Sequence, residues 1–125
     1  MVFNLKRFII YGFTNEEVSK MKNLIKFVSS NIEYINVENE DFNKTLGEVI
    51  LEEKFNIQEK FILEEKIVIF QNVVPKELDV YFKILKDKLS KKIIFATVTP
   101  NSINMKIEDL FNEFKMEREY FKKNK

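Results

Sequence analysis

Short apolar runs alternate with amphipathic stretches along this chain. Four runs are rich in β-branched and aromatic residues, which is typical of strands, and they span residues 8–11, 32–37, 67–70 and 93–98. The first and third runs are apolar throughout, as central strands covered on both faces should be. The second run includes Glu33 and Asn36, which an edge strand tolerates. The pattern predicts a sheet with the first and third strands at its centre.

Four helical patterns follow the four strands in turn. In the first and third, apolar residues recur with the i, i+3, i+4 spacing of an amphipathic helix. The first consists of Val18, Met21, Leu24, Ile25 and Val28, and the third of Leu78, Tyr81, Phe82, Ile84, Leu85 and Leu89. The second is marked by Leu46, Val49, Ile50 and, if it extends further, Phe55; the fourth is marked by Ile107, Leu110, Phe111 and Phe114, with Tyr120 and Phe121 as an extension.

Local start signals support the first and third helices. Thr14 and Glu17 have the spacing of a capping box, in which each side chain accepts a hydrogen bond from the backbone amide of the other residue. Pro75 suits the first turn of the third helix, because an amide hydrogen there would have no partner within the helix. Glu77 then occupies the position in the third helix that Glu17 has in the first.

The two halves of the chain have the same order of elements, which predicts an internal duplication with one copy at about residues 7–55 and the other at about 66–116. Residues 8–11 match 67–70 at a spacing of 59, Glu17 matches Glu77 at 60, and Val37 matches Val98 at 61. Each change of spacing falls in a connection, where an extra residue is tolerated. The repeated Asn43 and Asn104 favour duplication over the chance similarity of generic strand and helix periods.

These elements predict an α/β fold. Strands that alternate with helices pair mostly in parallel through right-handed crossovers. We expect a four-stranded, mostly parallel sheet in the order 2-1-3-4, built from two βαβα repeats, with helices on both faces and a pseudo-twofold axis between strands 1 and 3. A chain of 125 residues has the usual size of one domain, so residues 1–125 are expected to form a single α/β domain.

Composition excludes several kinds of chemistry. The chain has no cysteine and no histidine, which removes thiol catalysis, disulfides, thiolate and imidazole metal ligands, and the most common general base. We predict no cofactor and no metal site on these grounds. The 13 phenylalanines and the single alanine, Ala96, predict a core filled by aromatic side chains.

Charge and hydropathy limit the binding partners and the cellular locations that we expect. The 21 basic and 20 acidic residues give a formal net charge of +1, so nucleic acid is not an expected partner. No apolar run approaches the ~20 residues that span a bilayer, and Lys6 and Arg7 interrupt the N-terminal stretch where a signal peptide would be apolar. We expect a cytoplasmic protein with no membrane attachment. The abundance of lysine, asparagine, isoleucine and phenylalanine suggests a bacterial source with AT-rich coding sequence.

A family resemblance rests on short motifs. Tyr11, Gly12 and Phe13 end the first strand before a capped helix, and Val98, Thr99, Pro100 and Asn101 follow the last strand before an acidic helix. With these motifs the chain resembles an uncharacterised bacterial family, domain of unknown function 3783. The resemblance implies a small bacterial α/β domain without an assigned activity, and it supplies no catalytic residues. The halves depart from each other where Glu38 and Asn39 replace Thr99 and Pro100, and where Gln71 or Asn72 stands opposite Gly12.

The first candidate binding site is the crevice between strands 1 and 3. Ligands of α/β sheets prefer the place where neighbouring strands send their chains to opposite sides. The lining residues expected there are Gly12, Phe13, Thr14 and Asn15 from the first half, with Gln71, Asn72 and Val73 from the second. A lone glycine has neither Rossmann nor Walker spacing, so a tight turn and a helix cap explain these residues better than a ligand does.

Two further groups of polar residues have alternative interpretations. Glu38, Glu40 and Asp41 could bind Mg²⁺ or Ca²⁺ through carboxylate oxygens, although acidic residues are favoured near a helix N-terminus in any case. Asn43 and Asn104 occupy matching positions before apolar helical residues, where asparagine is a good N-cap. If they do not cap, they are a symmetric pair of candidate ligand contacts.

No set of residues amounts to a recognisable catalytic site, so the sequence leaves the function open. The leading hypothesis is a non-enzymatic small binding or protein-interaction domain, with a homodimer or a protein partner covering exposed strand edges and aromatic helices. The alternative is a small carboxylate-based enzyme with its site at the C-terminal ends of strands 1 and 3, using Glu38, Asp41 or Tyr11. It requires a concave pocket in which carboxylates converge.

Overall fold

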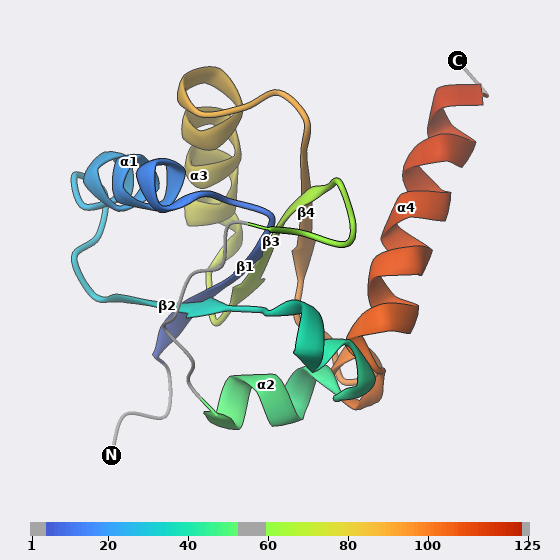
Figure 1. The fold of residues 1–125 in the computed structure, drawn as a ribbon. Helices are drawn as coiled ribbons and strands as arrows, with labels where there is room; N and C mark the ends of the chain where they lie inside the picture. Colours follow the sequence, from blue (N-terminus) through green and yellow to red (C-terminus); the bar gives the residue numbers. More distant parts are fainter. Residues whose placement is uncertain (1–4, 53–59, 124–125) are drawn as a thin grey trace.

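Four strands form one sheet in the computed structural model of the chain, which describes residues 5–52 and 60–123. The strands are β1 (Lys6–Tyr11), β2 (Ile32–Asn36), β3 (Lys66–Gln71) and β4 (Ile93–Thr97). Their order is β2-β1-β3-β4, which confirms the prediction (Figure 1). Each central strand has four consecutive buried residues, because both of its faces are covered.

The two central strands run antiparallel. β1 pairs in parallel with β2, and β3 pairs in parallel with β4, whereas β1 and β3 are antiparallel with Ile9 opposite Ile69. The predicted mostly parallel sheet is confirmed, with this single antiparallel pair at its centre. The predicted pseudo-twofold relation explains the pair, because an axis perpendicular to the sheet reverses the direction of the strand on its other side.

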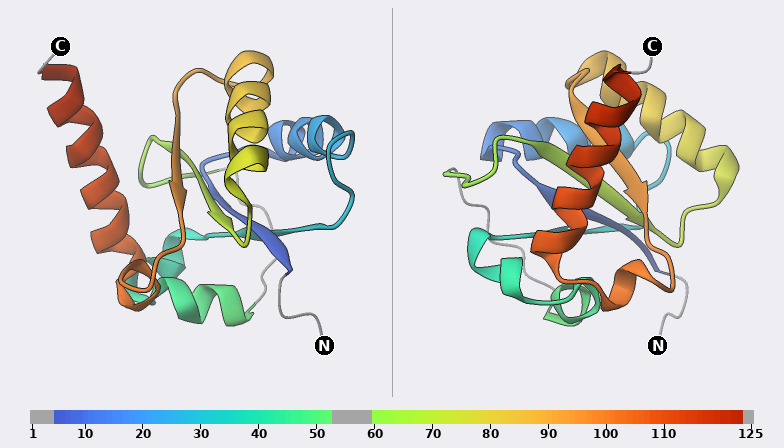
Figure 2. Two further views of the ribbon diagram at one scale, coloured as in Figure 1. Left: turned by 180° about the vertical axis from the view of Figure 1, so that it is seen from behind. Right: turned by 90° about the vertical axis from the view of Figure 1, so that its right-hand side faces the viewer.

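Helices cover both faces of the sheet, as predicted. α1 (Asn15–Ile25) and α3 (Pro75–Lys88) lie on one face, and α2 (Leu46–Glu52) and α4 (Ile107–Lys123) lie on the other (Figure 1, Figure 2). Alternate residues of β1 enter different cores: Phe8 and Ile10 pack with α1 and α3, and Ile9 and Tyr11 pack with α2 and α4. Two 3₁₀ helices, η1 (Asn39–Asn43) and η2 (Ser102–Asn104), connect β2 to α2 and β4 to α4.

Aromatic rings fill both cores, as the composition predicted. Phe8 contacts Phe70 and Tyr81 edge to face, with ring centroids 4.8 and 5.1 Å apart. On the other face the ring centroid of Phe111 lies 5.4 Å from that of Tyr11. Ring pairs of this kind contribute about 0.5–1.5 kcal/mol each beyond the area that they bury.

The helix boundaries differ from the prediction in two places. α1 ends at Ile25, and Val28, which was expected on its apolar face, is 39% exposed. The described part of α2 ends at Glu52, and the predicted extension to Phe55 lies outside the described residues. Pro75 occupies the first turn of α3, as predicted.

The halves correspond at a spacing of 60 in their central strands, not 59. Ile9 faces Ile69 across the antiparallel pair, and the residues that follow the two strands, Gly12 and Asn72, both have a positive φ, of 89° and 61°. A spacing of 59 would equate Phe8 with Ile67, whose side chains enter different cores. Because side chains alternate along a strand, a shift of one residue moves every side chain to the other face.

Reciprocal backbone bonds join the starts of α2 and α4. Leu46 N donates to Met105 O at 2.9 Å, and Ile107 N donates to Lys44 O at 2.8 Å. Each half therefore satisfies an amide at the beginning of its own helix with a carbonyl of the other half. The halves are structurally equivalent, and their origin by duplication stays a prediction.

Two equivalent ion pairs also join the halves. Lys6 Nζ lies 2.6 Å from Glu77 of α3, and Lys66 pairs with Glu17 of α1. Glu17 completes the predicted capping box with Thr14, through bonds of 3.0 and 3.2 Å. Burial alone would raise the pKa of Glu17, but Lys66 and Thr14 outweigh burial and hold that pKa below its usual value. The hydrogen bond to Glu77 raises the pKa of Lys6.

We expect Glu17→Gln to weaken the acid dependence of stability. The pKa of Glu17 is lower in the folded chain than its ordinary value of 4.5, so its carboxylate stabilises the fold above that pH. This contribution is lost as the pH falls through the folded-state pKa. The variant should be about 1 kcal/mol less stable than the parent at neutral pH, and the difference should shrink as the pH falls below 4.5. Urea unfolding across this range measures it.

Lys66→Gln is the matched test of the same pair. It should reproduce most of the loss at neutral pH, and the double variant should lose less than the sum of the two single variants, because they remove the same interaction. A pH profile of Glu17→Gln that runs parallel to the parent's would contradict this account.

Candidate functional site

The turns that follow β1 and β3 lie at opposite edges of the sheet. Because the two strands are antiparallel, Tyr11 at the end of β1 pairs with Ile67 at the start of β3, and Gln71 pairs with Arg7. The structure therefore does not bring Gly12, Phe13, Thr14 and Asn15 into one crevice with Gln71, Asn72 and Val73. A catalytic site shared by the C-terminal ends of both strands is ruled out for the same reason. A ligand role for either group by itself stays a prediction.

The geometry of the β1–α1 turn requires Gly12. Its φ is +89°, and a Cβ at this position would lie 1.9 Å from the carbonyl oxygen of Glu65. Phe13 is fully buried, Thr14 caps α1, and Asn15 is the exposed first residue of that helix. The turn and cap interpretation thus accounts for the first three residues.

The second predicted group serves the opposite edge of the sheet. Gln71 Oε1 accepts a hydrogen bond from Arg7 Nη1 at 3.2 Å, and Arg7 Nε lies 2.8 Å from a carboxylate oxygen of Glu33 in β2. Asn72 Nδ2 donates to Leu5 O at 2.9 Å. These contacts tie β1, β2 and β3 together.

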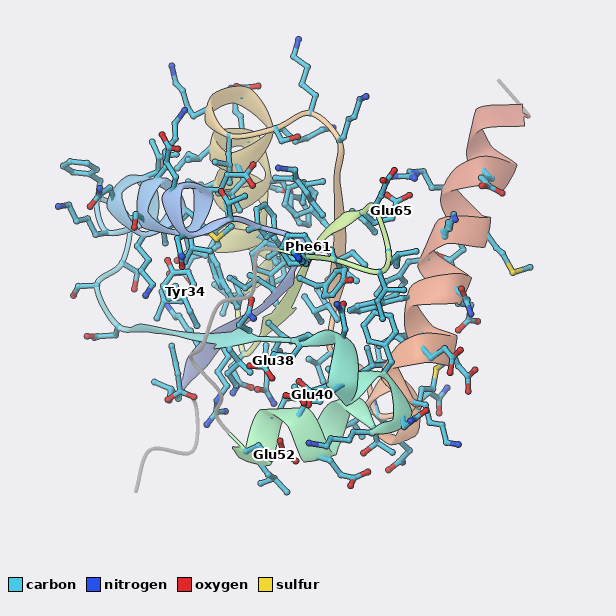
Figure 3. The ribbon with its side chains drawn as sticks, in the orientation of Figure 1. Tyr34, Glu38, Glu40, Glu52, Phe61 and Glu65 are labelled. Atoms are coloured by element: carbon cyan, nitrogen blue, oxygen red, sulfur yellow. The ribbon has the colours of Figure 1, made fainter. Side chains whose placement is uncertain are left out.

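The predicted acidic cluster is part of the structure around η1. Asp41 is fully buried: one oxygen accepts from Glu38 N at 2.9 Å, and the other lies 3.2 Å from Lys44 Nζ. The same ammonium group lies 2.9 Å from Glu52 of α2. Figure 3 shows Glu38 and Glu40 beside η1 and Glu52 on α2. Within residues 5–52 and 60–123, no group of three or more metal-ligating side chains is arranged to hold an ion.

Asn43 and Asn104 are not helix N-caps, contrary to the favoured interpretation. Each is the last residue of a 3₁₀ helix. Thr45 caps α2 instead: its hydroxyl accepts from Glu48 N at 3.2 Å, and Glu48 Oε1 accepts from Thr45 N at 3.1 Å. Both asparagines are exposed, and their role as ligand contacts stays a prediction.

Tyr11 fixes the segment that leads into β3. Its hydroxyl donates to Asn39 Oδ1 at 2.7 Å and accepts from Leu63 N at 3.2 Å, and Asn39 Nδ2 donates to Lys60 O at 3.0 Å. Burial raises the pKa of Tyr11, which keeps the hydroxyl protonated near neutral pH. Its chemistry is that of a structural hydrogen-bonding group.

A groove of ≈ 400 Å³ runs between the edge strand β4 and the helix α4, and we call it the β4–α4 groove. Its lining comprises Ile93, Ile94, Phe95, Ala96, Phe114, Glu117 and Arg118. Figure 2 shows α4 passing alongside β4 on the face that it shares with α2. The strand and Phe114 supply an apolar lining, and Glu117 and Arg118 supply a charged rim.

A larger cleft of ≈ 780 Å³, which we call the Gly12 cleft, lies next to the groove. Ile93 and Arg118 line both spaces. The cleft is also lined by Gly12, Phe61, Leu63, Glu64, Glu65, Lys66, Ser90, Lys91 and Lys92. Arg118 Nη2 lies 2.5 Å from Glu65 Oε1, and Figure 3 shows Glu65 beside α4. The predicted Gly12 therefore does line a concave site, but with neighbours other than those expected.

β4 offers backbone hydrogen-bonding groups along this groove. Val98 N donates to Phe70 O of β3 at 3.0 Å. Backbone groups alternate between the two sides of a strand, so Ile93, Phe95 and Thr97 present their N–H and C=O groups to the outer side. No other strand of the described chain pairs there. β4 also contains no charged residue, although charges commonly protect exposed strand edges.

The first half has a cleft of its own at the β2 edge, with a volume of ≈ 820 Å³. Residues 29–32 in its lining correspond to residues 90–93 of the Gly12 cleft at a spacing of 61. Lys22 Nζ lies 5.3 Å from the ring centroid of Tyr34, and burial raises the pKa of that tyrosine. The strand itself carries Glu33, which pairs with Arg7. The β2 edge is therefore charged, in contrast to β4.

Sequence reasoning missed the residues of the groove. Phe95, Phe114 and Arg118 come from separate elements, and periodicity does not show that they share one space. Two signals were available: the uncharged β4 segment, and Ala96 as the single alanine among large apolar residues.

The fold and the groove together define an α/β domain with one open, uncharged edge strand. Residues 66–121 match the family model described as Domain of unknown function (DUF3783). This match agrees with the family resemblance seen in the motifs, over the second half of the chain. No curated protein and no solved structure matches the chain. The matched segment contains β3, α3 and β4, and α4 up to residue 121, so the β4–α4 groove lies entirely within it.

Membrane insertion through a helix has no support in the described part of the chain, where no helix is long and apolar enough to cross a bilayer.

Proposed function

We propose that this chain is a non-enzymatic protein-interaction domain that binds an extended segment of a partner by adding it to β4 as a further strand. The observation that carries the proposal is an uncharged edge strand whose open side borders an apolar groove. In strand addition, backbone hydrogen bonds provide affinity and pockets for alternate side chains provide specificity. The open edge of β4 supplies the backbone hydrogen-bonding groups, and the β4–α4 groove supplies the pocket for side chains.

The free energies expected for strand addition at β4 suit a modest, reversible interaction. Three outward residues offer both a donor and an acceptor, and each hydrogen bond contributes about 0.5–1.5 kcal/mol net. Burial of one or two aliphatic side chains in the groove adds about 1.5–3 kcal/mol each. Ordering a flexible segment costs several kcal/mol in return. The balance corresponds to the micromolar range that is common for short peptide segments.

The three residues that were candidates for carboxylate-based catalysis have structural roles. Asp41 is buried against Lys44 and the η1 backbone, and Tyr11 is engaged by Asn39 and Leu63. Glu38 belongs to the η1 capping box. A binding role therefore accounts better for the described surface.

A cytoplasmic location in a bacterium is part of the same proposal. Its support is compositional: the chain has no cysteine for disulfides, and it is rich in lysine and asparagine. A homodimer, formed by pairing of two β4 edges, is the self-association form of the proposed interaction.

The variant Thr97→Pro tests strand addition. Thr97 is exposed and its N–H points outward, so proline removes a donor from the open edge without breaking a bond to β3. We expect the parent to enrich peptides from a library of random ten-residue peptides with free carboxyl ends, and Thr97→Pro to bind them at least about tenfold more weakly. Its unfolding free energy should remain within about 1 kcal/mol of the parent's.

Thr97→Val is the matched control, because it retains the backbone N–H and should bind the enriched peptides as the parent does. If the parent enriches no peptide, or if Thr97→Pro binds the peptides unchanged, strand addition at β4 is wrong.

Light scattering at high concentration tests the homodimer. A dimer that dissociates in Thr97→Pro would show that a second copy is the partner, whereas a strict monomer would exclude self-association.

A further inference from the structure

We infer that the partner strand adds antiparallel to β4, with a carboxylate at its end held by Lys91 and Lys92 in the Gly12 cleft. This inference rests on the proposed function and adds the direction and the chemistry of the partner. It follows from the positive charge at the N-terminal end of β4, beside the β4–α4 groove.

Lys91 and Lys92 are the unpaired cations of the cleft. Both are exposed, both line the cleft, and neither forms an ion pair within the described part of the chain. The other two cations are engaged, Lys66 with Glu17 and Arg118 with Glu65. Glu64 also lines the cleft, and two lysines against this one carboxylate leave an excess of positive charge.

The position of these lysines sets a direction. They immediately precede Ile93, the first residue of β4, so they stand at the N-terminal end of the open edge. A partner strand that runs antiparallel places its carboxyl end there. A parallel partner would place an amino end or its preceding residues against two like charges, which is unfavourable. The charges thus favour the antiparallel direction.

The groove specifies the residue type that comes before the carboxylate. Its wall consists of Ile94 and Ala96 on the strand and Phe114 on the helix. Ala96 is the single alanine of the chain, and its small side chain leaves room where a larger residue would fill the space. In an added strand, alternate side chains point toward one face. We therefore expect aliphatic or aromatic residues at alternating positions before the acidic end.

A second copy of the chain fits this chemistry less well than a separate partner. If two β4 strands paired antiparallel about Phe95, Lys92 would stand opposite Val98 and Lys91 opposite Thr99 of the second copy. Residues 97–101 contain no carboxylate that could pair with the lysines. The favoured occupant is therefore an extended apolar segment of another protein that ends in, or is followed by, an acidic group.

The peptides enriched by the parent protein provide the test. Fluorescence polarisation should be measured with each peptide in three forms: a free carboxyl end, a C-terminal amide, and an amide preceded by aspartate. We expect the amide to bind about three- to tenfold more weakly than the free carboxylate at low salt, and the aspartate form to recover binding if a side-chain carboxylate also suffices. The difference should diminish at high salt, because the lysines are exposed.

Protein variants locate the effect. Lys91→Gln combined with Lys92→Gln should weaken binding of the free-carboxylate peptide about three- to tenfold and abolish its advantage over the amide. The control is Lys20→Gln, which changes an exposed lysine of α1, on the opposite face from α4, and should leave both affinities unchanged.

The two proposals fail in different ways. The acidic-end inference would be overturned if the protein bound the amide and the carboxylate forms of a peptide equally. It would also be overturned if the double lysine variant bound the peptides as the parent does, while Thr97→Pro still disrupted binding. Absence of any enriched peptide overturns strand addition itself. Persistence of binding in Thr97→Pro together with loss in the lysine variant would show that the cleft binds carboxylates without an added strand.

Discussion

Replacing Gly12 with alanine should lower the free energy of unfolding by about 3 to 5 kcal/mol. The φ of Gly12 is +89°, which a residue with a Cβ adopts only under strain, and the new methyl carbon would lie 1.9 Å from Glu65 O. The clash is with backbone, so β1 and the segment leading into β3 would have to separate. Urea unfolding followed by circular dichroism measures the loss.

Asn72→Ala is the matched control for this prediction, because Asn72 occupies the equivalent position after β3. Its φ of 61° is a conformation that asparagine tolerates, and its side chain donates to Leu5 O at 2.9 Å. The alanine variant should lose about 1 to 2 kcal/mol, from one hydrogen bond and mild strain. A Gly12→Ala variant that is no less stable than Asn72→Ala would show that the turn can relax, contrary to the close approach described here.

Phe111→Ala should cost about 3 to 5 kcal/mol and loosen the attachment of α4. Phe111 is 1% exposed, and its ring centroid lies 5.4 Å from that of Tyr11, 5.6 Å from Phe42 and 6.4 Å from Phe114. Truncation leaves a cavity between α4 and the sheet, next to the wall of the β4–α4 groove. Thermal or urea unfolding measures the stability, and amide hydrogen exchange along α4 measures the loosening.

Met116→Ala is the control on the same helix. Met116 is 68% exposed, so its truncation should change stability by no more than about 0.5 kcal/mol. If Phe111→Ala had an equally small effect, the packing of α4 against Tyr11 and Phe42 would not be what holds the helix beside β4.

The proposed binding surface arises where the two equivalent halves differ. The halves share the reciprocal backbone bonds at the starts of α2 and α4 and the ion pairs of Lys6 and Lys66, and residues 29–32 and 90–93 each line a cleft. Within residues 5–52 and 60–123, only the second half has an uncharged edge strand beside an apolar groove with two unpaired lysines at its end. The equivalent strand in the first half carries Glu33, paired with Arg7. We therefore infer that the features common to both halves build the scaffold, and that the features found in the second half serve binding.

The sequence by itself determined the elements, their order and the local signals of the helices. Alternating and helical periodicity reflect which side chains face the core, and the Thr14–Glu17 capping box involves atoms three residues apart, so both are readable along the chain. The central position of β1 and β3 followed from their uninterrupted apolar character. The cap of α2 was also readable, because Thr45 and Glu48 have the same spacing as Thr14 and Glu17, although Asn43 was the cap that we predicted.

Only the tertiary structure decided the relation between elements that are distant in the chain. The match of Ile9 with Ile69 fixes a spacing of 60, whereas alignment of apolar residues could not distinguish it from 59 in strands that are buried on both faces. The antiparallel direction of β1 and β3 separated Gly12 from Asn72, and the passage of α4 beside β4 created the groove. These features depend on packing between side chains that lie about 60 residues apart in the sequence. Periodicity shows which face of each element is buried, but it does not show which other element covers that face.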